Sequence, residues 1–356
     1  MAKKQVGILY GGRSVEHDIS LRSAKNILQN IDREQFTVHL LAIDKDGCWY
    51  SGADLDQPMH SGTPLLLKLD ARKPYFAAGD QQIRPDVIFP VLHGTDGEDG
   101  SVQGLLQTMN IAYVGSGVLG SAAAMDKLLT KRVLRSAGLP VAAFAACTYN
   151  QQKQLSFRQL AADLGLPFVI KPVSLGSSVG VSVIHREEEF AGAVKEAFNY
   201  DQTVLFEEHI DGREVECALL GNDKPVVSVA GEIILAKKYE FYSFTAKYED
   251  PDSAALTIPA DMPEAIHEKV KELSLQAYTL LNCQDLARVD LFVKANGEVL
   301  INEINTIPGF TNISMYPALI RHAGIGYQEL ISRLLEMALE RHRQSRRITT
   351  DYTTLL

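Results

Sequence analysis

Two short stretches near residue 300 carry the acidic side chains with the clearest potential for chemistry. Residues 286–293 and 299–305 both alternate between apolar and polar side chains as strands do, and Asn296-Gly297 lies between them. An Asn-Gly pair between alternating segments is a strong signal for a hairpin with a two-residue turn. Such a turn sets Asp290 directly opposite Glu303.

The same register sets Arg288 opposite Asn305, so that these polar side chains share one face of the hairpin. Two carboxylates placed opposite each other repel unless a cation lies between them. Oxygen ligands from Asp290, Glu303 and Asn305 suit a hard ion such as Mg²⁺ that is held partly by substrate phosphates. The hairpin therefore predicts a magnesium site.

The alternative is that this polar face is an outer surface covered by water. The register also opposes Phe292 and Ile301 on that face, and a face turned wholly to water would not favour this pair. The other face is predicted to be a core face with Asn302 as its only polar member. Its apolar members are Ala287, Val289, Leu291, Val293, Leu300 and Ile304.

A glycine-rich loop earlier in the chain could cover phosphate. Residues 174–180 read Ser-Leu-Gly-Ser-Ser-Val-Gly, and backbone N–H groups in such a loop can point at oxygen anions. The loop lacks the GxxxxGKS or GxxxxGKT pattern, and a strand follows it, so a hairpin flap is predicted and not a P-loop. Lys171 before the loop and Lys127 on the preceding helix could together neutralise a triphosphate. A plain surface hairpin is the alternative.

The elements that must position these groups follow an α/β pattern. In the first third, short apolar strands alternate with helix-like stretches, and the strands are expected at residues 6–10, 38–43 and 87–92. A helix is expected over residues 121–137, where apolar residues recur at helical spacing. A domain boundary is expected close to Ser121.

A small second domain is expected beyond that helix, with strands at residues 168–170 and 181–184 and a charged helix at 186–198. A further amphipathic helix is expected over residues 264–282, just before the carboxylate hairpin. Residues 236–260 form the longest stretch without periodicity. Because loops of that length in compact domains are often functional, this stretch is a candidate lid.

Length and composition restrict the class of protein. The chain has 356 residues, which exceeds the size that one core usually supports, so two or three domains are expected. The net charge of -9, with no basic face, argues against a nucleic-acid partner. No apolar run has the length of a signal peptide or a membrane span, so we expect a cytoplasmic protein that acts on small molecules, with no membrane partner. Free thiols are expected at Cys48, Cys147, Cys217 and Cys283.

Six motifs resemble the D-alanine–D-alanine ligase family of the ATP-grasp superfamily, in the family's order and along nearly the whole chain. The motifs are GGRSVEHDIS at 11–20, HGTDGEDG at 93–100, KP at 171–172 with GSSVG at 176–180, AKY at 246–248, ARVD at 287–290, and NEINT at 302–306 followed by PG at 308–309. Each motif is modest alone, and their common order makes the resemblance specific.

The resemblance implies an α/β protein with a three-domain ATP-grasp fold and an N-terminal Rossmann-like (pre-ATP-grasp) domain. The corresponding domains are 1–121 on the substrate side, 122–212 with the flap, and 213–356 with the hairpin and the lid. It also implies that ATP converts the carboxylate of one D-alanine to an acyl phosphate. The amine of a second D-alanine then attacks and phosphate leaves, giving D-alanyl-D-alanine for peptidoglycan synthesis. A homodimer is the oligomeric state that the resemblance suggests.

Roles for individual residues follow from the matching motifs. Glu16 would hold the ammonium of the first D-alanine, with Ser177 and Tyr248 hydrogen-bonded to it in a chain that fixes the lid, and His93 would lie nearby. Taken singly, Glu16 or Ser14 could instead cap a helix, His93 could lie in an ordinary turn, and Tyr248 could be a core aromatic.

The resemblance assigns the remaining substrate and metal contacts to the C-terminal third. Arg288 and the backbone N–H of Gly309 are similar to the oxyanion hole, and Ser314 is similar to the residue that holds the carboxylate of the second D-alanine. The metal residues would bind two Mg²⁺ ions, for which Mn²⁺ is a substitute. They are Asp290, Glu303 and Asn305.

The nucleotide contacts come from several motifs. Glu207 and Glu214 resemble the acidic residues on the adenine and ribose side of the family's ATP site, although a shift of one residue would exchange Glu207 for Glu208. The remaining ATP-binding residues implied by the resemblance are Lys127, Lys171, Lys247 and Ser178.

Tyr248 bears on the substrate, because members of the family that form depsipeptides resemble this motif with phenylalanine there. A phenol tied to Ser177 and Glu16 would help to bind an amine nucleophile, so the dipeptide is favoured over a D-lactate ester. Leu175 differs from the charged or polar residue of some relatives, which leaves the contacts of the flap open.

Two other functions are compatible with parts of this pattern. An ATP-grasp ligase for a different acid would share the nucleotide and metal residues, and Glu16, His93 and Ser314 discriminate against it. A catalytically silent nucleotide-binding regulator could lose Arg288 and the metal carboxylates without losing its fold, and all of them are present.

Overall fold

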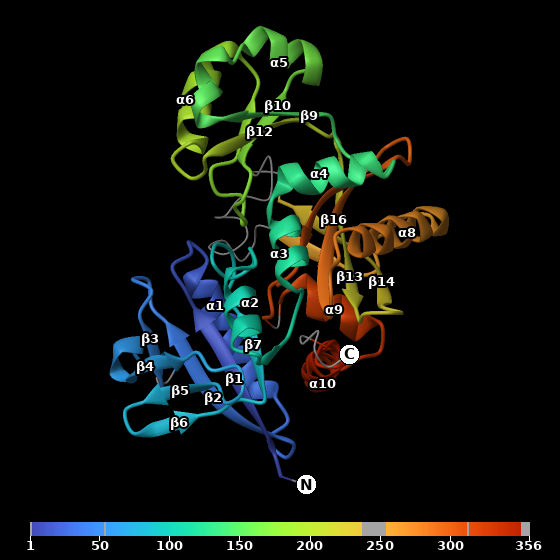
Figure 1. Cartoon of the computed structure of the whole chain (residues 1–356). Coiled ribbons are helices and arrows are strands. Elements are labelled where there is room, and N and C mark those ends of the chain that lie inside the picture. The colour runs from blue at the N-terminus through green and yellow to red at the C-terminus, as the bar shows by residue number, and fades with distance from the viewer. Residues whose placement is uncertain (1, 53–54, 237–253, 312, 350–356) are drawn as a thin grey trace.

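The structure is a computed structural model that describes residues 2–52, 55–236, 254–311 and 313–349. Three β-sheets, each accompanied by helices, follow one another along the chain (Figure 1). The first has eight strands, the second four and the third five. The predicted α/β class is therefore confirmed.

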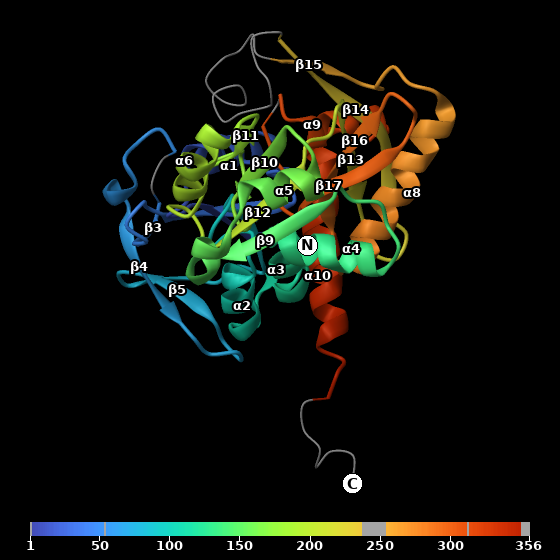
Figure 2. The same cartoon turned by 90° about the horizontal axis from the view of Figure 1, so that it is seen from above.

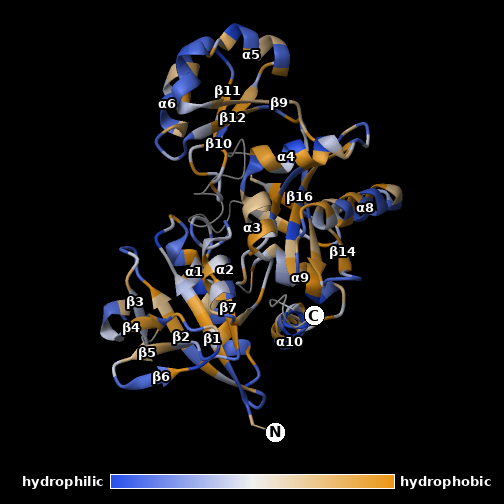
Figure 3. Ribbon diagram, in the orientation of Figure 1, coloured by the Kyte–Doolittle hydropathy of each residue, from blue (hydrophilic) through white to orange (hydrophobic). Residues whose placement is uncertain are grey.

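The N-terminal sheet has the strand order β6-β5-β4-β3-β2-β1-β7-β8. Its parallel strands are β1 (Lys4–Gly11), β2 (Phe36–Ile43), β7 (Val87–Val91) and β8 (Ala112–Tyr113). The antiparallel strands are β3 (Trp49–Ser51), β4 (Thr63–Lys68), β5 (Tyr75–Ala78) and β6 (Gln81–Ile83). The helices are α1 (His17–Asn30), the 3₁₀ helix η1 (Met59–Ser61) and α2 (Ser101–Thr108). The strands expected at residues 6–10, 38–43 and 87–92 are confirmed as β1, β2 and β7, and the apolar runs of β1 and β7 reflect burial in the centre of the sheet (Figure 3).

The central sheet has the order β11-β10-β12-β9 and lies at one end of the molecule (Figure 1). Its strands are β9 (Phe144–Thr148), β10 (Phe168–Pro172), β11 (Ser182–Ile184) and β12 (Thr203–Glu208). Its helices are the 3₁₀ helix η2 (Tyr149–Gln154), α5 (Phe157–Leu164) and α6 (Glu187–Ala197). Strands β10 and β11 are antiparallel, so the predicted hairpin around residues 174–180 is confirmed.

The C-terminal sheet has the order β15-β14-β13-β16-β17. Its strands are β13 (Gly212–Leu220), β14 (Val226–Leu235), β15 (Ala254–Thr257), β16 (Leu286–Lys294) and β17 (Val299–Asn305). Two helices cover its two faces (Figure 2). They are α8 (Glu264–Leu280), which confirms the predicted helix, and α9 (Met315–His322). The last helix, α10 (Tyr327–Ser345), packs against β7 and β8 and so ties the C-terminal region to the N-terminal sheet.

The prediction of a single helix over residues 121–137 is wrong, because two helices occupy this region. They are α3 (Val118–Met125) and α4 (Lys127–Ser136). Asp126 between them has an extended ψ of 99°, and its side chain accepts the N–H of Leu129 at 2.8 Å. An aspartate is a preferred N-cap because its carboxylate satisfies an N–H in the first helical turn. The apolar spacing continues across this cap, so the sequence pattern did not reveal the break between the two helices.

The register of the carboxylate hairpin is partly as predicted. The turn consists of residues 295–297 and not of two residues, since Val293 pairs with Val299 and Gly297 has a φ of 84°. A bulge then leaves Asn302 as an extra residue between two pairs. The extra turn residue and the bulge compensate, so Asp290 does lie opposite Glu303 as predicted. Arg288 likewise lies opposite Asn305.

The predictions for the rest of this hairpin need correction. Ile301 pairs with Leu291 and is fully buried in the core, whereas Phe292 pairs with Leu300. Asn302 is not a core residue, because the bulge turns it toward Lys171, whose ammonium donates to its amide oxygen at 3.4 Å. The predicted pairing of Phe292 with Ile301 is wrong because the extra turn residue shifts the register here by one. The bulge that restores the predicted register lies beyond this pair, at Asn302.

Other expectations can be compared with the described residues. The candidate lid at 236–260 lies largely outside them, and part of its remainder is strand β15. Within the described part of the chain, no helix is long and apolar enough to cross a membrane. All four cysteines are free thiols, as expected.

Candidate active site

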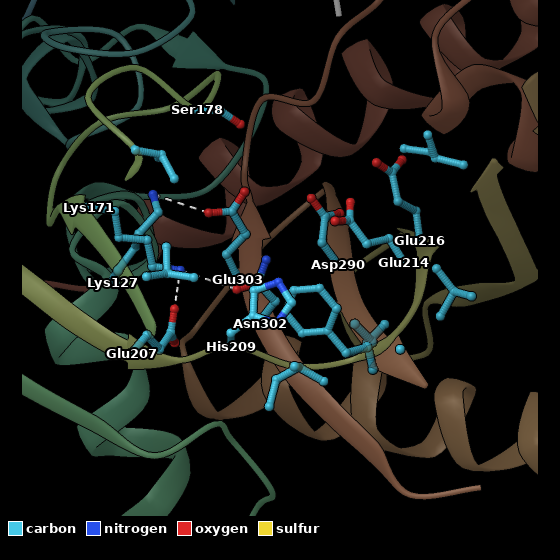
Figure 4. Close-up of a pocket in the computed structure, with 18 of the residues that line it drawn as sticks. Lys127, Lys171, Ser178, Glu207, His209, Glu214, Glu216, Asp290, Asn302 and Glu303 are labelled. Atoms are coloured by element: carbon cyan, nitrogen blue, oxygen red, sulfur yellow. Dashed lines mark hydrogen bonds and ion pairs between the residues drawn. The ribbon is translucent and has the colours of Figure 1, made fainter. Parts of the chain in front are cut away.

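A cleft of about 470 Å³ lies between the central and C-terminal sheets (Figure 4). The flap at 174–180 and strand β10 form one side, the β12–β13 connection forms the floor, and the carboxylate hairpin forms the other side. Of the residues predicted for the nucleotide and metal sites, the described ones that line it are Lys127, Lys171, Ser178, Glu207, Glu214, Asp290 and Glu303.

Three carboxylates form a row across the C-terminal sheet. Glu216 on β13 pairs with Asp290 on β16, and Asp290 pairs with Glu303 on β17. Directly paired residues point to the same face, so the three carboxylates lie side by side. Such a row repels itself unless cations neutralise it, and it therefore marks a place prepared for positive charge.

Arg288 provides part of that charge. Its Nε and Nη2 donate to the two oxygens of Asp290 at 2.7 and 2.6 Å, and Nε lies 3.0 Å from Glu216. Asn305 donates its amide N–H to Asp290 at 3.0 Å. The four polar residues predicted to share a face are therefore in one cluster, together with Glu216.

The lysines predicted to bind phosphate approach the hairpin from the opposite side of the cleft. The ammonium of Lys127 lies 3.1 Å from Glu303 and donates to the carbonyl of Leu175 in the flap at 2.7 Å. Lys171 contacts the carboxylate of Glu207, whose other oxygen contacts the fully buried Lys131. The two predicted lysines thus converge on one cavity, which the sequence alone could not establish.

The structure also distinguishes Glu207 from Glu208. Glu207 is buried with its carboxylate between two lysines, whereas Glu208 is half-buried and accepts the backbone N–H of Ala143 at 3.2 Å. Burial raises the pKa of Glu207, but Lys131 and then Lys171 outweigh it and hold that pKa below its ordinary value. Glu207 is therefore an ionised member of the cleft.

A hydrogen bond from Ser177 joins the flap to the N-terminal domain. The hydroxyl of Ser177 donates to Glu16, which is buried at the start of α1. Ser177 and Ser178 both have left-handed backbone, with φ of 54° and 58°, which costs free energy for non-glycine residues. A side chain at Gly176 would come within 2.9 Å of Glu16, so glycine is what lets the flap approach this closely.

His93 connects the N-terminal sheet with the loop that follows β17. Its Nδ1 lies 3.0 Å from the carbonyl of Ile307 and its Nε2 lies 3.0 Å from the hydroxyl of Ser23. A carbonyl can only accept, so Nδ1 carries a proton and donates. Burial lowers the pKa of His93. The imidazole ring is therefore neutral, and the hydrogen bonds at its two nitrogens position the loop.

Glu98 fastens the same loop from a second point. Its two oxygens accept the N–H groups of Gly94 and Ile307 at 2.8 and 3.1 Å. Burial, followed by the nearby charge of Glu16, raises the pKa of Glu98 to about 8. The carboxyl group is therefore poised to exchange a proton near neutral pH.

The remaining substrate-side residues lie just beyond this loop. Ser314 is the N-cap of α9, and its hydroxyl accepts the N–H of Thr311 at 3.1 Å. A side chain at Gly309 would come within 3.0 Å of the Ser314 hydroxyl, so the two residues are neighbours. Lys247 and Tyr248, which were assigned to phosphate and to the hydrogen-bonded chain, lie outside the described residues.

The chain is similar to known proteins along nearly its whole length. A sequence model described as D-ala D-ala ligase N-terminus matches residues 5–116, and one described as D-ala D-ala ligase C-terminus matches residues 133–336. The chain belongs to the D-alanine–D-alanine ligase family. D-alanine–D-alanine ligase from Shouchella clausii is 47% identical over 365 residues, which cover 99% of both chains. D-alanine–D-alanine ligase A from Escherichia coli K12 is 47% identical, covering 96% of this chain and 97% of the relative.

Solved structures agree with this assignment to the ligase family and with the predicted ATP-grasp fold. The D-alanine–D-alanine ligase from Coxiella burnetii has a TM-score of 0.87 at 38% identity and covers 98% of this chain and 97% of its own. The VanG D-Ala:D-Ser ligase from Enterococcus faecalis has a TM-score of 0.85 at 31% identity and covers 95% of this chain and 100% of its own.

The hairpin of this family member suits a divalent metal that is shared with phosphate. Among the described residues, no three His, Cys, Asp or Glu side chains are grouped closely enough to hold an ion alone. Asp290 and Glu303 are opposed, with Asn305 adjacent, and an Mg²⁺-type ion commonly takes one or two carboxylates and completes its shell with phosphate oxygens and water. The donor set fits such an ion only when nucleotide phosphates contribute.

Three contributors to this ligase site were missed in the sequence. Lys131 lies four residues after Lys127 on α4, and this spacing could have indicated a shared helix face. Glu98 lies inside a motif that was recognised as a whole. Glu216 could be found only from the pairing of β13 with β16, which joins strands about 70 residues apart in sequence.

Proposed function

We propose that this protein joins two D-alanine molecules to D-alanyl-D-alanine, using ATP and releasing ADP and phosphate, for peptidoglycan synthesis. The observation that carries the proposal is the cleft in which lysines and a carboxylate row face each other, in a member of the D-alanine–D-alanine ligase family. Opposed cationic and metal-binding walls suit a phosphoryl group that must be transferred to a carboxylate.

On the nucleotide side, Lys127 and Lys171 would bind phosphates under the flap, and Ser178 would donate to them from the flap itself. Glu207 would face the adenine and Glu214 the ribose. This division is supported by the positions of all five residues around one cleft. Lys247 belongs to the same proposal through its motif.

Asp290, Glu303 and Asn305 would hold two divalent ions, with Mg²⁺ as the proposed metal and Mn²⁺ as a substitute. A bound metal would neutralise charge on the transferred phosphoryl group. Arg288 now donates to Asp290. When Asp290 contacts a metal instead, Arg288 would be available to stabilise the oxyanion of the tetrahedral intermediate, together with the N–H of Gly309.

On the amino-acid side, Glu16 would hold the ammonium of the first D-alanine, with Ser177 and Tyr248 completing the chain of hydrogen bonds. His93 would position the loop that carries Gly309, and Ser314 would bind the carboxylate of the second D-alanine. The hydrogen bond from Ser177 to Glu16 and the contacts of His93 with the loop support this arrangement. Held close together, acid and amine react as in an intramolecular step.

The remaining parts of the proposal concern the molecule as a whole. The functional domains would be residues 1–121, 122–212 and 213–356, the protein would act in the cytoplasm, and two copies would form a homodimer. Light scattering coupled to gel filtration measures the molar mass directly. A mass near that of one 39.2 kDa chain would contradict the dimer without affecting the proposed reaction.

The decisive experiment measures phosphate release from purified protein with ATP and Mg²⁺. The amino acids supplied are D-alanine, L-alanine, D-alanine with D-lactate, or D-alanine with D-serine, and mass spectrometry identifies the products. We expect release that depends on D-alanine and yields the dipeptide. Release without dependence on D-alanine would contradict the proposal, and preference for D-serine or D-lactate as second substrate would reassign its specificity.

A further inference from the structure

Helix α4 carries two lysines that face the cleft region but have different surroundings. Lys127 and Lys131 are four residues apart and so project from the same side of the helix. The ammonium of Lys127 reaches the cleft, where it contacts Glu303 and the flap. Lys131 is fully buried, and its described ion-pair partner is Glu207.

Burying an ammonium group in the protein interior is unfavourable unless an opposite charge lies beside it. Removing an ion from water costs several kcal/mol unless a well-placed opposite charge returns that free energy. Burial accordingly lowers the pKa of Lys131, and Glu207 opposes that effect. Because Lys131 is enclosed, it cannot itself touch a nucleotide, so any influence on binding must pass through Glu207.

Glu207 divides its carboxylate between two cations. One oxygen contacts Lys131 and the other contacts Lys171, whose side chain is 10% exposed and lines the cleft. The strands around it fix this division, since Glu207 lies on β12 opposite Val169 of β10, and Lys171 is two residues further along the same strand. The three groups therefore form a chain from the interior of the protein to the cleft.

We propose that Lys131 is a positioning residue for nucleotide binding. By holding one oxygen of Glu207, it leaves only the other oxygen for Lys171, so that the Lys171 ammonium remains available to a phosphate. Without Lys131, both oxygens of Glu207 would turn to Lys171 and withdraw that ammonium from the cleft. The inference rests on the proposed function, because it requires that the cleft binds a nucleotide.

The alternative is that Lys131 only anchors α4 to the central sheet. An anchor would affect the stability of the fold and would leave the affinity of the folded protein for nucleotide unchanged. Positioning would weaken nucleotide binding while leaving the response to D-alanine intact. Affinity and stability therefore separate the two roles.

The experiment uses the full-length chain and measures the Kd for Mg²⁺-ADP by titration calorimetry, the KM for D-alanine and the midpoint of thermal unfolding. For Lys131→Met we expect the Kd for ADP to rise about tenfold and the KM for D-alanine to stay within about twofold. Arg132 is the next residue on α4 and is exposed, so Arg132→Met is the matched control and should bind ADP like the wild type.

Lys131→Gln provides a second variant in case the methionine variant does not fold. It retains an N–H donor toward Glu207 but not the charge, so an intermediate rise in the Kd for ADP, of about threefold, is expected. A folded variant at position 131 with the wild-type Kd would overturn the positioning role. Failure of the wild type to bind ADP would instead contradict the proposed function itself.

Discussion

Two clusters of charged side chains line the cleft in this protein, and they have opposite signs of excess charge. On the β12 side, one carboxylate, Glu207, contacts two lysines. On the hairpin side, the guanidinium of Arg288 contacts two members of a row of carboxylates. The members of that row are Glu216, Asp290 and Glu303. The first cluster has an excess of positive charge suited to phosphate, and the second an excess of negative charge suited to metal ions.

The clusters also differ in how far they are removed from water. The side chain of Lys131 is 0% exposed and that of Glu207 is 5% exposed, whereas those of Asp290 and Glu303 are 15% and 20% exposed. Charges enclosed by protein depend on one another for folding, whereas charges at a cleft can exchange partners with ions and substrates. The same chemical change, acid to amide, should therefore affect stability in one cluster and activity in the other.

The largest expected effect is on the hairpin. Asp290→Asn removes the charge at the centre of the row, so we expect ligation to fall by about 10³-fold at saturating ATP, because transition-state charge stabilisation through a metal is worth several kcal/mol. Phosphate release measures this, with Asp223→Asn, at an exposed position, as the control. Ligation within about tenfold of the wild type would show that Asp290 is not central to the metal site.

The next effect tests the opposite cluster. Glu207→Gln leaves the buried Lys131 without its carboxylate, and we expect the free energy of unfolding of the nucleotide-free protein to fall by about 3 kcal/mol. The matched control is Glu303→Gln on the hairpin, where partial exposure limits the change to about 1 kcal/mol. Urea unfolding measures both. Equal losses would remove the distinction between an enclosed and an open cluster.

A smaller effect concerns the flap that joins the β12 side to the N-terminal domain. Ser177→Ala removes a hydrogen bond to the carboxylate of Glu16, and we expect kcat/KM for D-alanine to fall about tenfold. Ser178→Ala, one residue further along the flap, should raise the KM for ATP instead. If both variants altered the same parameter, the two sides of the flap would not serve different substrates.

The last expected effect is a dependence on pH, and it concerns Glu98, a carboxyl group beyond the hairpin that has no lysine or arginine ion-pair partner among the described contacts. Its pKa of about 8 lies above the ordinary value of 4.5, so the folded state keeps a proton that the unfolded state releases. Stability from this group is complete below pH 4.5 and is lost as the pH rises through about 8, by at most about 1.4 kcal/mol per pH unit.

Glu98→Gln cannot titrate, and the slope of the free energy of unfolding against pH should become flatter between pH 5 and 8. Urea unfolding at several pH values in this interval measures the slope. An unchanged slope would show that the pKa of Glu98 is not raised in the folded protein.

Much of the fold followed from local sequence pattern. Strands β1, β2 and β7 of the N-terminal sheet, the flap hairpin and helix α8 were predicted from periodicity and turn residues, which act over a few neighbours. The break at Asp126 was missed because the apolar spacing of two helices happened to continue across the cap. Lys247 and Tyr248 remain predictions, since they lie outside the described residues.

The sequence by itself determined the carboxylate hairpin, because strand alternation and the turn residues Asn296-Gly297 leave few registers. The pairing of Asp290 with Glu303 also required the bulge at Asn302, which compensates for the extra turn residue. Only the tertiary structure decided that Glu216 extends the row, that Lys131 and Lys171 share Glu207, and that a bulge turns Asn302 toward the cleft. These features depend on contacts between segments distant in the chain. Their stability comes from burial and opposed charge in the assembled fold, which no local pattern encodes.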